Sequence, residues 1–148
     1  MLALRDPVSD MLGIRATGAL SLMAAVAEGL PITSLDRVVH AVAGDDSTFA
    51  YRIVARATLA RRRKAWATPQ HQADGRLSAD EGARLARLSS VWAMALDVWG
   101  ETDAARRFMF AAHPLLHGRC PMDIVLESEL GRPVVEGLLG RLQYGSAV

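Results

Sequence analysis

The chain has 148 residues, the size of one or two small domains, and it can bury a core without a metal or a disulfide. Alanine fills 25 positions, while runs of Val, Ile, Thr and aromatic residues are missing. This composition disfavours a β-sandwich or barrel and predicts an all-α fold. The 51% share of hydrophobic residues excludes disorder for most of the chain.

Charge and cysteine content predict a cytoplasmic protein. The longest uncharged stretch near the N-terminus, residues 16–27, is too short to span a bilayer. Residues 1–10 carry Arg5, Asp6 and Asp10, which does not fit a signal peptide. The single cysteine, Cys120, excludes an intrachain disulfide and suits a reducing compartment.

The charge is concentrated in one block. The net charge is +1, yet residues 52–76 hold seven basic side chains and one acidic one. The basic ones are Arg52, Arg56, Arg61, Arg62, Arg63, Lys64 and Arg76. Such a block attracts phosphate backbones, and it is equally compatible with a solvated helix face or a basic linker.

Short helices are predicted in the first half, at residues 16–30, 35–43, 46–53 and 56–67. Ser34 is expected to cap the second helix, and Asp46 or Ser47 the third. Short helices joined by tight turns, of which the last is basic, are typical of a helix-turn-helix domain. We therefore predict an N-terminal extension at residues 1–15, a helix-turn-helix module at 16–68 and a linker at 69–76.

Residues 77–148 form a second predicted module. Ser78 and Glu81 form a capping box, which predicts a long helix that Gly100 ends. Three further helices are predicted: from Glu101 or Thr102 to before His113, over residues 121–126, and after residues 131–133. Trp92 and Trp99 share one face of the long helix, which favours core packing over contact with a partner.

Sites of chemistry are few. His113, His117 and Cys120 are close in sequence, but a fourth zinc ligand is not evident, which favours structural loop residues over a metal site. No nucleotide-binding or hydrolase motif occurs. We therefore expect no cofactor, no metal and no catalytic residue.

The basic helix has the side chains for DNA contact, namely Arg56, Thr58, Arg61, Arg62, Arg63 and Lys64. Arginine offers a planar fork to phosphates or guanine edges, and Thr58 a hydroxyl or a methyl group. Three successive arginines on a helix point about 100° apart, so they cannot all read bases.

The last helix contains Gly137 and Gly140, which cost helix stability and usually permit close approach of another backbone. That backbone could belong to this chain or to a partner. The C-terminal tail has an arginine and a tyrosine, and it is either a frayed terminus or a binding hot spot.

The second half closely resembles the toxin-binding domain of the Xre/MbcA/ParS antitoxins. The resemblance rests on Leu77-Ser78-Ala79-Asp80-Glu81, Arg84-Leu85-Ala86-Arg87-Leu88, Ala95, Trp99-Gly100, Ala104-Ala105-Arg106-Arg107-Phe108, His113-Pro114-Leu115-Leu116, Gly118, Pro121-Met122-Asp123, Gly131, Val134-Val135, Leu138-Leu139, Arg141-Leu142 and Tyr144-Gly145. Upstream, Arg56-Ala57-Thr58-Leu59-Ala60-Arg61-Arg62 is similar to the recognition helix of the family's Xre-like module.

The resemblance implies a RES-domain toxin as partner, which degrades NAD or transfers ADP-ribose. It implies that the C-terminal region covers the toxin's NAD pocket, with toxin contacts at Leu138, Arg141, Leu142, Gln143, Tyr144, Gly145 and Val148. It also implies a homodimer that binds operator DNA and represses its own operon. A stand-alone repressor with a C-terminal dimerisation domain is the alternative, and a small enzyme built on His113, His117 and Cys120 is a third.

One turn departs from the family pattern. The family has Gly, an apolar residue and Ser before the recognition helix, where this chain has Ile53, Val54 and Ala55. Isoleucine does not easily adopt a positive φ, and alanine cannot cap a helix. The sequence therefore predicts a turn of different construction.

Overall fold

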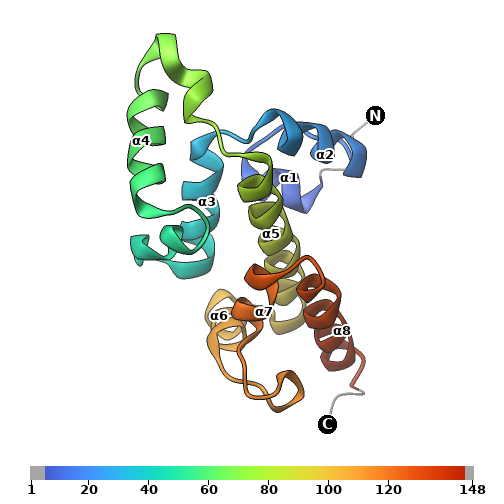
Figure 1. The fold of residues 1–148 in the computed structure, drawn as a ribbon. Coiled ribbons are helices and arrows are strands. Elements are labelled where there is room, and N and C mark those ends of the chain that lie inside the picture. Colours follow the sequence, from blue (N-terminus) through green and yellow to red (C-terminus); the bar gives the residue numbers. More distant parts are fainter. Residues whose placement is uncertain (1–5, 146–148) are drawn as a thin grey trace. The chain divides into compact units, whose positions relative to one another are not determined.

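The computed structural model describes residues 6–145, and all regular structure in this range is helical (Figure 1). No strand occurs among these residues, so the predicted all-α fold is confirmed. The chain divides into two compact units between Ala86 and Arg87, inside α5 (Ala79–Trp99). We call them the N-terminal unit and the C-terminal unit.

The N-terminal unit contains four α-helices, two short 3₁₀ helices named η1 and η2, and the first part of α5 up to Ala86. In chain order, the helices before α5 are α1 (Pro7–Leu12), α2 (Ala19–Glu28), α3 (Ile32–Ala43), η1 (Ser47–Arg52), α4 (Arg56–Trp66) and η2 (Pro69–Gly75). The amphipathic α3 supplies much of the core, with Leu35, Val38 and Val42 fully buried.

The predicted N-terminal extension contains α1, which packs on α3. The buried Ser34 hydroxyl donates to the carbonyl of Leu12 at 2.5 Å, and Arg37 donates to two more α1 carbonyls at 3.0 and 3.3 Å. These bonds satisfy carbonyls that the end of α1 leaves open. The prediction that Ser34 caps a helix was wrong, because α3 already begins at Ile32.

The segment predicted as a linker, residues 69–76, forms η2 against α4. Gly75 is buried there, and a Cβ on it would lie 2.7 Å from the carbonyl oxygen of Arg62 and from the amide nitrogen of Trp66. The next residue, Arg76, holds its guanidinium 5.7 Å from the Trp66 ring centroid and donates to the carbonyl of Gly29 at 2.9 Å. The predicted domain bounds at residues 15, 68 and 76 stay predictions. The division into an N-terminal and a C-terminal unit does not test them.

The C-terminal unit contains the rest of α5 and the helices that follow it. These are α6 (Thr102–Phe110), the 3₁₀ turn η3 (Pro114–Leu116), α7 (Pro121–Glu127) and α8 (Gly131–Gln143). Trp92 is 1% exposed, which confirms its core role, whereas Trp99 is 40% exposed and lies 5.7 Å from Phe108 between ring centroids.

No single helix among residues 6–145 is long and apolar enough to cross a membrane. Among the described helices, α2 and α3 would together be long and apolar enough, but the chain bends by 117° between them.

Candidate functional site

The basic helix α4 begins after a turn that contains no left-handed residue. Ile53 has φ −106°, and Ala55 occupies the N-cap position with φ −55° and no side-chain hydrogen bond. Arg84, from the first part of α5, donates to the carbonyl of Ile53 at 2.8 Å. The turn is thus fixed by a side chain from a later helix, where the family pattern has glycine and serine.

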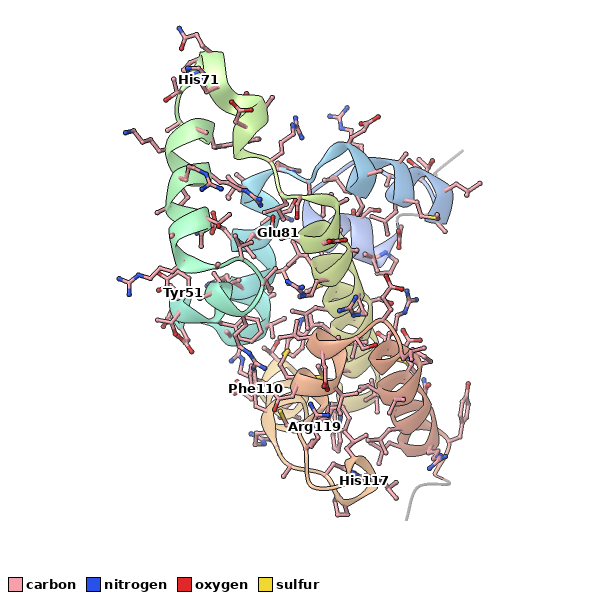
Figure 2. The ribbon with its side chains drawn as sticks, in the orientation of Figure 1. Tyr51, His71, Glu81, Phe110, His117 and Arg119 are labelled. Atoms are coloured by element: carbon pink, nitrogen blue, oxygen red, sulfur yellow. The ribbon has the colours of Figure 1, made fainter. Side chains whose placement is uncertain are left out.

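Arg62 on α4 points into the N-terminal unit. Its guanidinium forms an ion pair with the carboxylate of Glu81, and the two side chains are 15% and 14% exposed. Burial, and secondarily the charge of Arg61, lower the pKa of Arg62. Figure 2 labels Glu81 at the start of α5, on the side that faces α4. Arg62 therefore joins α4 to α5.

Glu81 has a second role in the same place. Its carboxylate accepts from the backbone amide of Ser78 at 2.8 Å, and the Ser78 hydroxyl accepts from the amide of Glu81 at 3.2 Å. The predicted capping box is confirmed by these two bonds.

Arg63 forms a two-pronged contact with Asp36 of α3. Its two terminal nitrogens donate to the two carboxylate oxygens at 2.8 and 3.0 Å. The hydrogen bond to Asp36 raises the pKa of Arg63. Both side chains remain about half exposed, so this is a surface pair that orients α4 on α3.

The other predicted DNA-contact residues lie toward the outside of α4. Arg56, Arg61 and Lys64 are exposed, Thr58 is partly buried, and Leu59 is buried on the inner side. The Arg56 guanidinium lies 5.6 Å from the ring centroid of Tyr51, which Figure 2 labels beside the start of α4. We call the exposed cations Arg56, Arg61 and Lys64 the α4 face.

In the C-terminal unit, α8 is anchored at its start and along one side. Gly131 lies so close to α7 that an added Cβ would be 1.9 Å from the carbonyl oxygen of Ile124. Glu136 accepts from the Ser90 hydroxyl of α5 at 3.3 Å and from Arg132 at 2.8 Å. The position of α8 in this unit is therefore set by both α7 and α5.

The outer side of α8 carries one continuous exposed row. Its members are spaced by four and three residues, which places them on one helical face. They are Leu130, Val134, Gly137, Arg141 and Tyr144, and we call them the α8 stripe. Leu130, Val134 and Tyr144 are 77%, 50% and 82% exposed, large values for apolar side chains. Leu130 was not among the predicted site residues, because no periodicity assigns it to this face before the helix bounds are known.

Two of the three glycines of α8, Gly137 and Gly140, have open space where a side chain would be. A Cβ added at Gly137 or at Gly140 would meet no atom within 4 Å. Among residues 6–145 no other backbone of this chain approaches these two glycines, so that alternative is wrong for the described residues, and approach by a partner stays a prediction.

The predicted toxin contacts separate into buried and exposed positions. Leu138 is 4% exposed and packs in the core, whereas Val134 of the same helix is 50% exposed. Leu142 is partly buried, and Arg141, Gln143, Tyr144 and Gly145 are exposed. Val148 lies outside the described residues.

His113, His117 and Cys120 lie around η3 and the residues after it. The Nδ1 atom of His113 accepts from the Leu115 amide at 3.1 Å, and its ring meets Phe108 edge-on with centroids 6.5 Å apart. His117 adopts a left-handed conformation with φ 56°. Between residues 6 and 145 no three His, Cys, Asp or Glu side chains are grouped to hold a metal ion. These contacts are those of a structured loop.

The comparisons with known proteins bear on the part of the chain that includes the α8 stripe. Residues 94–145 match the family described as antitoxin Xre/MbcA/ParS C-terminal toxin-binding domain. The match starts inside α5 and ends at Gly145, the last described residue. No curated protein matches the chain. Residues 94–145 therefore carry a toxin-binding domain of the Xre/MbcA/ParS antitoxin family.

Proposed function

We propose that the chain neutralises a RES-domain toxin by covering the toxin's NAD site with its C-terminal region. The observation that carries the proposal is the α8 stripe, an exposed row of apolar and aromatic side chains with one arginine that lies inside the toxin-binding domain. Inhibition by covering a cofactor site requires binding and no chemistry, which agrees with the expectation that the chain is not an enzyme.

The composition of the stripe suits a tight protein contact. Tyrosine and arginine are enriched among interface hot spots, and Tyr144 and Arg141 are neighbours on one helical face. Anchored on α5 and α7, α8 loses little conformational entropy on binding. The bare backbone at Gly137 lets a partner segment approach closely. We infer that Val134 and Gly137 dock the helix while Arg141, Tyr144 and the residues after them enter the pocket.

The first test is co-expression with the neighbouring open reading frame and purification by a tag on this chain. We expect a second protein to co-purify, with NAD-consuming or ADP-ribosyl-transferring activity that appears only when it is released. Truncation after Gln143 is expected to restore toxicity while the truncated chain keeps its helical content. A co-purified toxin that does not act on NAD would overturn the RES assignment and leave the antitoxin role intact.

We further propose that the chain binds operator DNA through the α4 face and represses its own operon as a homodimer. Arg56, Arg61 and Lys64 are exposed on one helix of a helix-turn-helix-like arrangement, which supports phosphate contact. Steep weakening of promoter binding with salt is the expected signature. If the chain shifts its promoter DNA and no toxin co-purifies, the stand-alone repressor becomes the better description.

A further inference from the structure

The first turn of α4 carries a cation that the carboxylates of the N-terminal unit do not engage. Arg56 is the first residue of α4, and its side chain is exposed. Arg62 and Arg63, farther along the helix, form ion pairs within the unit, whereas Arg56 pairs with no carboxylate among residues 6–145. The Arg56 guanidinium lies instead 5.6 Å from the ring centroid of Tyr51, within the range of a cation–π contact.

The ring of Tyr51 is held in place by its neighbours in the chain. Phe49 and Ala50 before it, and Ile53 and Val54 after it, are buried, while Tyr51 itself is 43% exposed. The backbone at this point is therefore fixed in the core, and the ring lies on the surface beside the start of α4 (Figure 2). A ring fixed in this way restricts the rotamers of the long arginine side chain that packs on it.

Tyr51 also lies close to a second arginine of α4. Arg56 and Arg63 are seven residues apart, about two helical turns, so they lie on the same side of the helix. The hydrogen bond to Asp36, the charge of Asp36 and, to a smaller extent, the nearby Tyr51 raise the pKa of Arg63. Because the Asp36 carboxylate offsets the charge of Arg63, Arg56 is the cation without a compensating carboxylate on this side.

The outer surface of α4 is suited to close approach at its first turns. Ala57 and Ala60 are small and exposed, so a DNA groove can come close to the helix beside Arg56. In a helix-turn-helix, the N-terminal residues of the recognition helix contact base edges. Arg56 has that position, whereas Arg61 and Lys64 lie farther along the helix and remain for phosphate contacts.

We propose that Tyr51 positions Arg56 to read a guanine in the major groove of the operator. The planar guanidinium donates two hydrogen bonds to O6 and N7 of guanine, a pair of acceptors that only this base presents there. Unlike a carboxylate, an aromatic ring leaves the charge of the guanidinium uncompensated. A side chain that is held before binding also loses less conformational freedom when it binds.

Tyr51 is thus a positioning residue that acts through Arg56. The inference rests on the proposed binding of operator DNA, and it names the base that this site selects.

The test is binding of the full chain to its own promoter fragment, measured by competition anisotropy at one salt concentration. Each G·C pair of the bound region is replaced in turn by A·T. In Arg56→Ala, we expect one G·C pair in each half-site to lose about 10-fold or more of its preference over A·T. Tyr51→Leu is expected to lower the same preference by about 3-fold, and Tyr51→Phe, which keeps the ring, should retain it.

The free chain provides a spectroscopic signature of the same contact. We expect ring-current shifts of the Arg56 side-chain protons in NMR spectra of the native chain and of Tyr51→Phe, and their loss in Tyr51→Leu. Circular dichroism verifies that the variants fold. Lys64→Gln is the control for a phosphate contact, and it should weaken the native and the substituted fragments equally.

Three outcomes would overturn the inference. Equal weakening of all fragments by Arg56→Ala would show a phosphate contact in place of a guanine contact. A folded Tyr51→Leu that keeps the native preference would remove the positioning role and leave the proposed DNA binding intact. A native chain that does not bind its promoter fragment would overturn the DNA-binding proposal itself, and this inference with it.

Discussion

The carboxylate of Glu81 binds the guanidinium of Arg62 while it also caps α5 through the amide of Ser78. One side chain thus stabilises the start of α5 and fixes the basic helix α4 against it. Arg62 is the central arginine of the Arg61-Arg62-Arg63 run, so the most basic part of the sequence is partly devoted to holding the fold. The remaining cations of α4 are then presented in a defined orientation.

Replacing Glu81 is expected to destabilise the N-terminal unit. In Glu81→Ala the cap is lost and Arg62 becomes a partly buried charge without its partner, which costs about 2 kcal/mol or more of unfolding free energy. Urea denaturation followed by circular dichroism measures the loss. The matched control is Asp80→Asn, which changes the neighbouring exposed carboxylate and should cost a few tenths of a kcal/mol. Equal losses in the two variants would contradict the double role of Glu81.

DNA binding is expected to depend on the α4 face more than on the paired arginines. Arg61→Gln and Lys64→Gln should each weaken promoter binding and lower the salt slope by about one unit per lost phosphate contact. Arg63→Gln is the matched control, because its guanidinium is held by Asp36. Fluorescence anisotropy over a salt series measures the slopes. A larger change in slope for Arg63→Gln than for Arg61→Gln would show that the Asp36 pair opens on DNA.

The glycines of α8 are expected to behave oppositely on substitution. Gly131→Ala would force a Cβ to within 1.9 Å of the Ile124 carbonyl oxygen, so it should cost several kcal/mol or prevent folding of the C-terminal unit. Gly137→Ala meets open space and should stabilise the helix by up to about 1 kcal/mol. Thermal denaturation separates the two effects.

Toxin binding supplies the second measurement for Gly137→Ala. If the toxin backbone approaches this position, the folded and more stable variant should still bind toxin more weakly, as measured by calorimetry. Unchanged affinity would mean that Gly137 has no part in the contact. Tyr144 is 82% exposed, so Tyr144→Ala should leave stability unchanged and weaken toxin binding by about 2 kcal/mol or more.

The contact between α1 and α3 is expected to contribute to stability through Ser34. Its hydroxyl is buried and donates to the Leu12 carbonyl, so Ser34→Ala leaves that acceptor unsatisfied at a cost of about 1–3 kcal/mol. Thr33→Ala, next to it on the exposed side of α3, is the control and should be nearly neutral. Chemical denaturation of both variants makes the comparison.

The sequence predicted helices well where their formation depends on residues close together in the chain. The capping box at Ser78 and Glu81, the proline start of α7 and the apolar spacing of α5 depend on neighbours within a few residues, and the structure has all three. The family motif in the second half can also be recognised without a structure, because it consists of particular residues in a fixed order along the chain. The toxin-binding domain at residues 94–145 could therefore be recognised from the sequence.

The sequence alone determined the all-α class, the concentration of basic charge in one helix and the antitoxin-family domain at residues 94–145. Only the tertiary structure decided which side chains face outward. Arg62 turns inward to Glu81, Leu138 enters the core, and α2 keeps Leu20 and Met23 on the surface. Helical periodicity places residues on a common face, but whether that face meets a neighbouring helix or solvent depends on contacts between segments far apart in the chain.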